Sequence, residues 1–175
     1  MDFYQIIRRN SRQPDYNFIH FMVDIVEAAS AEQLAIVGDL LVEYARSLNV
    51  SLCFENLDKE VAGLPGPYAR PSGRLLLAAE AGRIAGCGAL KRVDDNVCEM
   101  KRLFLRPEFR GKGAGKAMTL RLLDEARSIG YKELRLDTLP SMKEAIALYR
   151  SLGFKEISPF RDLPAPGTLF MTISL

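Results

Sequence analysis

The residues from Arg110 to Lys116 combine glycine with positive charge in a way that suits anion binding. They read Arg110-Gly111-Lys112-Gly113-Ala114-Gly115-Lys116 and lie just before a segment of helical apolar periodicity. Glycine lacks a Cβ, so its backbone can approach a ligand closely and adopt positive φ angles. The unpaired N–H groups and positive dipole end of a helix start also favour an anion. The stretch therefore predicts a loop that binds a diphosphate.

Two familiar nucleotide-binding motifs do not fit this loop. A P-loop needs glycine where Arg110 stands and a hydroxyl side chain where Ala117 stands. The dinucleotide-binding fingerprint needs glycine at the position of Lys116. A tight turn that binds nothing is the remaining alternative, and it explains the three cations less well.

The apolar periodicity on both sides of the loop predicts the elements that position it. Strands are expected at Met22–Glu27, Arg74–Glu80, Arg83–Val93, Val97–Leu105, Lys132–Thr138, Lys155–Ser158 and Thr168–Leu175. Helices are expected from a Ser30–Gln33 capping box to Leu48, and at Glu55–Ala62, Gly115–Ile129 and Met142–Leu152. This order predicts one α/β (or α+β) domain, a mixed sheet covered by helices, over residues 22–175. Residues 1–21 are expected to form a polar N-terminal arm.

Further segments flank the loop in a fixed order. Leu103-Phe104-Leu105-Arg106-Pro107-Glu108-Phe109 precedes Arg110-x-x-Gly113-x-Gly115, Glu80-Ala81-Gly82-x-x-Ala85-Gly86 lies in the preceding hairpin, and Ala147-Leu148-Tyr149-Arg150-Ser151-Leu152-Gly153-Phe154 comes later in the chain. In order and spacing these segments resemble the GCN5-related N-acetyltransferases (GNAT) over residues 22–175. The resemblance implies a mostly antiparallel central sheet flanked by helices. It also implies acetyl transfer from acetyl-CoA to an amine.

The resemblance implies where acetyl-CoA binds. The pyrophosphate is expected on the backbone amides from Arg110 to Lys116, and pantetheine beside the strand end formed by Leu103, Phe104 and Leu105. A short strand that ends at Pro107 is consistent with this, because its peptide groups could pair with a ligand. Many relatives have an asparagine after the strand that ends here at Thr138. Here Ser141 could donate the equivalent hydrogen bond, or it could cap the following helix with Glu144.

Acetyl transfer to an amine requires that the amine lose a proton, that the oxyanion be stabilised and that the leaving thiolate be protonated. The resemblance gives the last role to Tyr149, whose phenol is neutral at pH 7 and can donate to sulfur. With Gly153 and Phe154 ending the helix, Tyr149 would also occupy the position that packs in a Schellman motif. The two roles are compatible.

Glu99 is the first choice for the base, because it is a carboxylate within the strand beside the cofactor segment. On strand alternation it is expected to share a face with Val97, Lys101 and Leu103. Apolar surroundings would raise its pKa toward that of a useful base. The alternative is an ion pair with a neighbouring lysine or arginine, or a water that relays the proton. Glu55 and Asp137 are further candidates.

The acceptor pocket is expected in the segments Phe54 to Arg70 and Ser158 to Gly167. Arg161 beside Phe160 could hold a carboxylate of the acceptor, or could be an ordinary surface arginine. We therefore expect a small-molecule amine or an amino acid as acceptor. The alternatives are a protein lysine or N-terminus, and a non-catalytic acyl-CoA sensor.

Composition excludes several other classes of function. A net charge of +2 gives no reason to expect nucleic acid or a membrane as partner. The three cysteines and single histidine show no metal-ligand or disulfide spacing, so no metal and a cytoplasmic location are expected. No apolar run is long enough for a signal peptide or a membrane span. The strand Thr168–Leu175 could pair across a homodimer.

Overall fold

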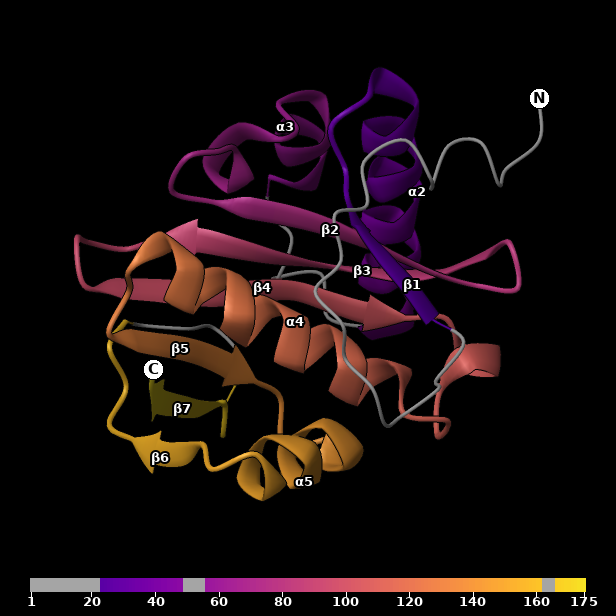
Figure 1. Cartoon of the computed structure of the whole chain (residues 1–175). Coiled ribbons are helices and arrows are strands. Elements are labelled where there is room, and N and C mark those ends of the chain that lie inside the picture. The colour runs from indigo at the N-terminus through magenta and orange to yellow at the C-terminus, as the bar shows by residue number, and fades with distance from the viewer. Residues whose placement is uncertain (1–22, 49–55, 162–165) are drawn as a thin grey trace.

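The computed structural model describes residues 23–48, 56–161 and 166–175, and Figure 1 shows their arrangement. The strands are β1 (Val23–Glu27), β2 (Arg74–Glu80), β3 (Arg83–Arg92), β4 (Val97–Leu105), β5 (Glu133–Thr138), β6 (Lys155–Ile157) and β7 (Leu169–Ser174). The α-helices are α2 (Ala31–Leu48), α3 (Leu57–Ala62), α4 (Ala114–Ile129) and α5 (Lys143–Ser151), with short 3-10 helices η2 (Gly66–Tyr68) and η3 (Pro107–Phe109). Each expected strand and helix is found, with bounds that differ by two residues or fewer.

Within the described residues the strands form one seven-stranded sheet in the order β1-β2-β3-β4-β5-β7-β6. Neighbouring strands are antiparallel except for β4 and β5, which are parallel. A parallel pair needs a crossover, and α4 supplies it. The structure thus confirms the expected mixed, mostly antiparallel sheet flanked by helices.

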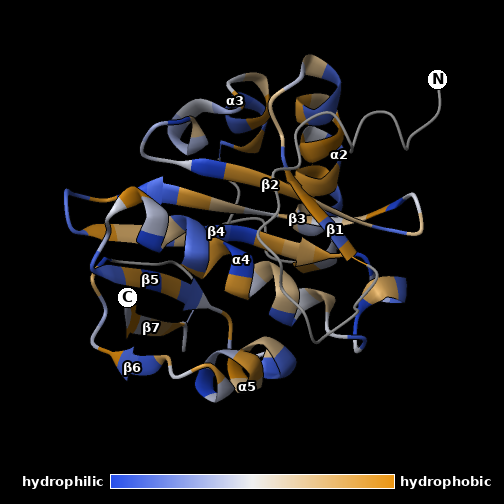
Figure 2. Ribbon diagram, in the orientation of Figure 1, coloured by the Kyte–Doolittle hydropathy of each residue, from blue (hydrophilic) through white to orange (hydrophobic). Residues whose placement is uncertain are grey.

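The sheet buries apolar side chains on both of its faces. One cluster packs α4 and α5 against the sheet through residues such as Met118, Leu122 and Leu134, and the other packs α2 through Val37 and Leu40. Figure 1 shows α4 running along the front of the sheet and α2 passing behind it. Figure 2 shows much of β2 and β4 in the apolar colour and the turn after β3 in the hydrophilic colour. The helices therefore cover opposite faces of the same sheet.

Local signals determine where several helices begin and end. Before α2, the Ser30 hydroxyl accepts a hydrogen bond from the backbone amide of Gln33 at 3.2 Å. The Gln33 side-chain oxygen accepts one from the backbone amide of Ser30 at 3.0 Å. This is the expected capping box. Gly130 follows α4 with a φ of 107°, which glycine adopts without strain.

The start of α5 differs from expectation. The helix begins at Lys143, Met142 holds the N-cap position, and no side chain caps it. Ser141 is exposed one residue before the cap, so the expected cap by Ser141 with Glu144 was wrong. The Met142 amide instead closes the turn on the Leu139 carbonyl at 2.9 Å.

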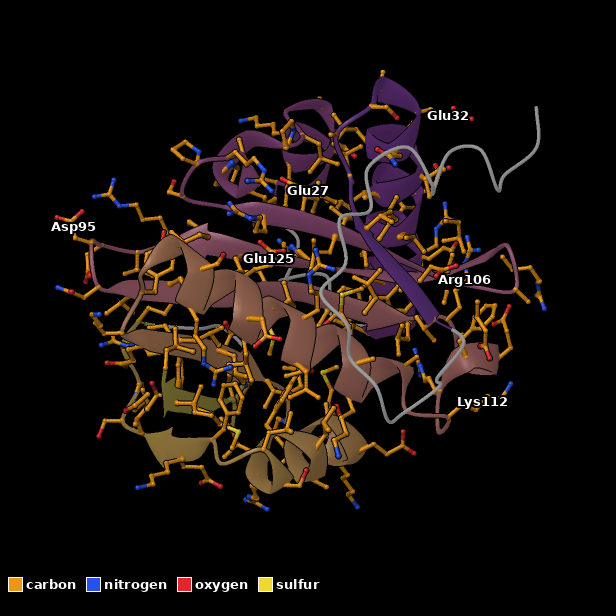
Figure 3. All side chains as sticks on the ribbon, viewed as in Figure 1. Glu27, Glu32, Asp95, Arg106, Lys112 and Glu125 are labelled. Carbon is orange, nitrogen blue, oxygen red and sulfur yellow. The ribbon has the colours of Figure 1, made fainter. Side chains whose placement is uncertain are left out.

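A buried ion pair fastens α4 to the start of β2. The Arg74 Nε lies 2.6 Å from a Glu125 carboxylate oxygen, and their side chains are 7% and 14% exposed. Arg121 donates to the same carboxylate at 2.9 Å. Glu125, labelled in Figure 3, thus lies where α4 meets the sheet. Burial acts to raise the pKa of Glu125, but the hydrogen bonds from Arg74 and Arg121 outweigh it, so the pKa lies below its usual range.

We expect Glu125→Ala to lower the free energy of unfolding by about 3 kcal/mol, because it leaves the buried Arg74 cation without its carboxylate. Glu156→Ala is the control: Glu156 pairs with Arg150, and both side chains are about half exposed, so the loss should stay below about 1 kcal/mol. Urea denaturation measures both. A carboxyl group whose pKa is lowered on folding stabilises the folded protein at pH values above its unfolded-state pKa. The difference in unfolding free energy between the two variants should therefore be present at pH 7 and shrink as the pH falls below about 4. Equal losses at pH 7 would contradict the assignment.

Candidate active site

The two parallel strands at the centre of the sheet pair over only part of their length. The register of β4 and β5 runs from Val97–Glu133 to Glu99–Arg135. Beyond Glu99 the carboxyl half of β4 keeps its pairing with β3. The two strands therefore form a fork, by which we mean the space between Met100–Leu105 and Leu136–Thr138. Unpaired peptide groups along a strand are suited to pairing with an extended ligand.

A β-bulge at Arg102 shapes the β4 side of this fork. Cys87 of β3 pairs with Phe104 and Ala89 pairs with Lys101, so two residues of β4 face the single Gly88. Arg102 has a φ of 57°. A bulge of this kind shifts the alternation of all later side chains.

The bulge corrects one expectation about β4. Leu103 was expected on the face of Glu99, but it packs in the cluster beneath α4 and α5, where Met100 also lies. Phe104 packs in the opposite cluster, against Tyr44 of α2, with ring centroids 5.2 Å apart. Simple alternation fails here because two consecutive residues, Lys101 and Arg102, both form ion pairs on the side of the sheet away from α4.

The glycine loop lies beyond the open end of the fork, at the start of α4. Gly111 and Gly113 have φ angles of 72° and 89°, which other residues adopt only with strain. The first helical hydrogen bond runs from the Ala117 amide to the Gly113 carbonyl at 2.9 Å. The amides from Ala114 to Lys116 therefore precede the helical ladder and are directed out of the helix start. Both glycines serve the backbone path that presents these amides.

Two of the three cations of the loop, Arg110 and Lys112, bind backbone carbonyls in this structure. Arg110 donates from Nε to the Leu105 carbonyl at 2.8 Å, and Lys112 donates to the Glu108 carbonyl at 3.1 Å. Lys112 is labelled in Figure 3 on the loop that follows η3. The Arg110 amide donates to the Pro107 carbonyl at 3.1 Å, so this amide, expected to bind pyrophosphate, has a partner within the chain. The amides that remain suited to an anion are those later in the loop.

Tyr149 is buried between α5 and the sheet. Tyr149 is 5% exposed, and the centroid of its ring lies 5.6 Å from that of Phe154. The Phe154 amide donates to the Tyr149 carbonyl at 3.0 Å, and Gly153 has a φ of 96°, so the helix ends in the expected Schellman motif. Burial, and then the nearby Tyr44 and Asp137, raise the pKa of Tyr149. The phenol is therefore protonated throughout the neutral range.

Glu99 belongs to a cluster of four charges at the inner end of the fork. Its side chain is 3% exposed, and its carboxylate accepts hydrogen bonds from both terminal nitrogens of Arg161, one of them at 3.1 Å. Lys101 Nζ lies 3.6 Å from the same carboxylate. The ion pair that was the alternative for Glu99 is thus what the structure shows, in place of purely apolar surroundings.

Asp137 completes this charge cluster, which consists of Glu99, Lys101, Asp137 and Arg161. Its carboxylate accepts from Lys101 Nζ at 2.9 Å and from Arg161. Burial acts to raise the pKa of Asp137, but Lys101 and Arg161 outweigh it and lower that pKa. Two carboxylates and two cations therefore balance, and among the described residues the buried Arg161 Nε has no hydrogen-bond partner.

The remaining predicted positions fall around the fork or outside the described residues. The Phe160 ring packs on Phe170 of β7 at 4.8 Å, and the Arg161 guanidinium lies 5.2 Å from its centroid. Arg161 is thus bound to protein carboxylates and is not a free surface arginine. Glu55 and the start of the segment Phe54 to Arg70 lie outside the described residues.

Two ion pairs of the site could not be found from sequence patterns. Arg102 pairs with Glu60, and Arg161 pairs with Glu99. Each pair joins residues far apart along the chain, so no local spacing marks it.

These features fit acetyl-CoA as a ligand. In the part of the chain that the structure describes, the fork offers a strand edge beyond the end of the β4–β5 ladder for an extended amide chain, and the start of α4 offers amides for a diphosphate. Within the described residues no group of His, Cys, Asp and Glu could hold a metal ion. In the same residues no helix has the length and apolar character needed to cross a membrane.

Comparison with known sequences points to the same activity. Residues 39–154 match the acetyltransferase (GNAT) family. An uncharacterized N-acetyltransferase of Schizosaccharomyces pombe is 35% identical over 138 residues, covering 78% of this chain and 85% of the relative. An IAA acetyltransferase of Azospirillum brasilense is 39% identical over 105 residues, covering 59% of this chain and 69% of the relative. An N-acetylaspartate synthetase of Danio rerio is 32% identical over 126 residues, covering 71% of this chain and 45% of that protein.

Solved structures share the fold at low sequence identity. A GNAT-family acetyltransferase of Staphylococcus aureus superimposes with a TM-score of 0.74 at 19% identity, covering 87% of this chain and 98% of that one. An acetyltransferase of Streptococcus agalactiae gives a TM-score of 0.71 at 21% identity, covering 89% and 99%. Since the family match spans the strands and helices that build the fork and the loop, the chain belongs to the acetyltransferase (GNAT) family, and its activity is acetyl-CoA-dependent N-acetyl transfer.

Proposed function

We propose that the acceptor is a small molecule that carries both a primary amine and a carboxylate, such as an amino acid. The observation that carries this proposal is the charge cluster of Glu99, Lys101, Asp137 and Arg161 at the inner end of the fork. It offers carboxylates to an ammonium group and, directly beside them, cations to a carboxylate. A zwitterion can therefore exchange with existing ion pairs and leave no charge of the cluster without a partner.

A relative supports this substrate class. N-acetylaspartate synthetase of Danio rerio is named for an N-acetylated amino acid, and 71% of this chain aligns with it at 32% identity. Aspartate carries an amine together with carboxylates, which is the combination of groups that the charge cluster suits.

The residues of the site have distinct roles in this proposal. The amides after Gly113 hold the pyrophosphate of acetyl-CoA, and the segment Leu103–Leu105 pairs with its pantetheine. Acetyl-CoA supplies the thioester that the amine attacks. Arg161 binds the acceptor's carboxylate, which frees Glu99 to accept the ammonium proton directly or through water. Tyr149 donates its phenol proton to the departing thiolate.

We expect amino acids to be acetylated at least tenfold faster, in kcat/KM, than the matching amines without a carboxylate. A charge-assisted hydrogen bond contributes roughly 1.5–3 kcal/mol, which corresponds to about 10- to 100-fold. The measurement follows thiol release from acetyl-CoA with pairs such as alanine and ethylamine, or an amino acid and its α-amide. Faster acetylation of peptides or of the simple amines would contradict the proposed substrate class.

Tyr149→Phe should lower kcat about a hundredfold while leaving the affinity for acetyl-CoA within about threefold, since it removes only the proton donor. Tyr131→Phe is the matched control, because Tyr131 is also buried and its hydroxyl donates to the Ser72 carbonyl at 2.7 Å, away from the fork. That variant should keep kcat. The raised pKa of Tyr149 further predicts that kcat does not fall through tyrosine ionisation up to about pH 9. An unchanged kcat in Tyr149→Phe would remove its role as acid.

Gly113→Val should weaken acetyl-CoA binding about 5- to 30-fold, because a left-handed backbone costs a side-chain-bearing residue roughly 1–2 kcal/mol. Gly130→Val provides the control, since Gly130 has a similarly positive φ at the other end of α4. It should lose stability but not affinity. Isothermal titration calorimetry with acetyl-CoA measures both dissociation constants, and equal affinities would overturn the diphosphate site.

A further inference from the structure

The bulge residue Arg102 holds a backbone conformation that its residue type disfavours. Its φ of 57° lies in the left-handed region, where most bulges of this type place glycine. A left-handed conformation is unfavourable for a residue with a Cβ. Such a conformation persists only where surrounding contacts determine it. Something must therefore hold Arg102 in place.

Those contacts come from the segment α3 to η2, on the side of the sheet away from α4. Arg102 donates from Nε and Nη2 to the two carboxylate oxygens of Glu60, at 2.8 and 2.5 Å. Tyr68 donates its hydroxyl to the same carboxylate at 2.7 Å. The side chains of Arg102 and Glu60 are 16% and 17% exposed, and Tyr68 is 4% exposed. The anchor is thus a bidentate, largely buried pair whose geometry fixes the direction of the Arg102 side chain.

The electrostatics of the anchor agree with its geometry. Burial acts to raise the pKa of Glu60, but the hydrogen bonds from Arg102 and Tyr68 outweigh it and lower that pKa. Burial and the hydrogen bond to Glu60 raise the pKa of Tyr68. Glu60 is therefore a carboxylate and Tyr68 a hydrogen-bond donor throughout the neutral range. Because Glu60 and Arg102 both stay charged, this ion pair links α3 to β4 throughout the neutral range.

The Arg102–Glu60 ion pair affects the segment Leu103–Leu105 because this segment comes directly after the bulge. Leu103 turns beneath α4, while Phe104 returns to the other face and pairs with Cys87 of β3. If Arg102 relaxed to ordinary strand geometry, the register of Leu103–Leu105 against β3 would have to change. These are the residues whose peptide groups border the fork.

We propose that Glu60 is a positioning residue for acetyl-CoA: with Tyr68 it holds Arg102 in its left-handed conformation and so sets the peptide groups of Leu103–Leu105 for pantetheine. The inference rests on the proposed placement of pantetheine along this segment. It gives α3, which lies outside the fork, an effect on cofactor affinity. The chemistry of the acetyl transfer does not use Glu60.

The test uses the whole protein and measures the dissociation constant for acetyl-CoA by isothermal titration calorimetry, with no acceptor present. Glu60→Gln removes the charge that anchors Arg102 and should weaken acetyl-CoA binding about 5- to 30-fold. This factor corresponds to the roughly 1–2 kcal/mol by which a residue with a Cβ disfavours the left-handed conformation. Adding Arg102→Gly should restore affinity to within about threefold of the original protein, because glycine adopts the positive φ without an anchor. The double variant should regain affinity even though its melting temperature stays low.

A purely structural role for Glu60 gives a different result. It would lower the melting temperature of Glu60→Gln but leave acetyl-CoA affinity unchanged, or would leave the double variant as weak as the single one. Either outcome overturns the proposal. If Glu60→Gln does not fold, Tyr68→Phe provides the test: it should weaken acetyl-CoA binding about two- to fivefold, since it removes one hydrogen bond to Glu60. The control Tyr131→Phe should not weaken binding. Equal affinities of Tyr68→Phe and Tyr131→Phe would overturn the proposal.

The same titrations separate this inference from the proposed function. If Gly113→Val binds acetyl-CoA as tightly as the original protein, the placement of the cofactor itself is wrong. If Gly113→Val is impaired while Glu60→Gln and Tyr68→Phe bind normally, only the role of Glu60 is wrong. Neither result depends on finding an acceptor.

Discussion

The architecture of the site depends on one interruption of backbone pairing, the end of the β4–β5 ladder at Glu99 and Arg135. Buried backbone N–H and C=O groups are costly without hydrogen-bond partners. Where a strand stops pairing in the middle of a sheet, such groups become available to a ligand. Both strands continue past this point, β4 on β3 and β5 on β7. The fork is therefore held open by the outer ladders, and an extended ligand can take the place of the missing pairing.

The proposed diphosphate site at the start of α4 is built mainly from backbone groups. Arg110 and Lys112 bond to carbonyls of the chain itself, so their charge shapes the loop as much as it attracts an anion. The amides at the start of α4 depend instead on Gly111 and Gly113, whose positive φ angles bend the chain into the helix. The proposed anion site thus combines loop conformation with a helix start, and the cations add a general positive potential.

Much of this fold can be predicted from the sequence because the signals that mark its elements are local. The Ser30–Gln33 box and the glycines after α4 and α5 act within a few residues, and each lies where it was expected. Ser141 shows the limit, since a capping pattern was present and the helix began beyond it. Alternation failed at Arg102 because a bulge depends on how β4 pairs with β3, which no spacing within β4 marks. Arg161 and Glu99 are 62 residues apart, so their pairing depends on the assembled sheet.

The balance of the charge cluster explains how a buried acid such as Glu99 can exist at the inner end of the fork. Its side chain is 3% exposed, and a carboxylate at that depth would cost several kcal/mol if Arg161 left without a replacement. An acceptor with an amine alone could replace Arg161 at Glu99, but it would leave the arginine to water and Asp137. An acceptor that also carries a carboxylate satisfies both sides of the exchange. In the proposed function, the cost of an unpaired charge is therefore what selects an acceptor with both groups, and the same ion pairs satisfy the cluster when no acceptor is bound.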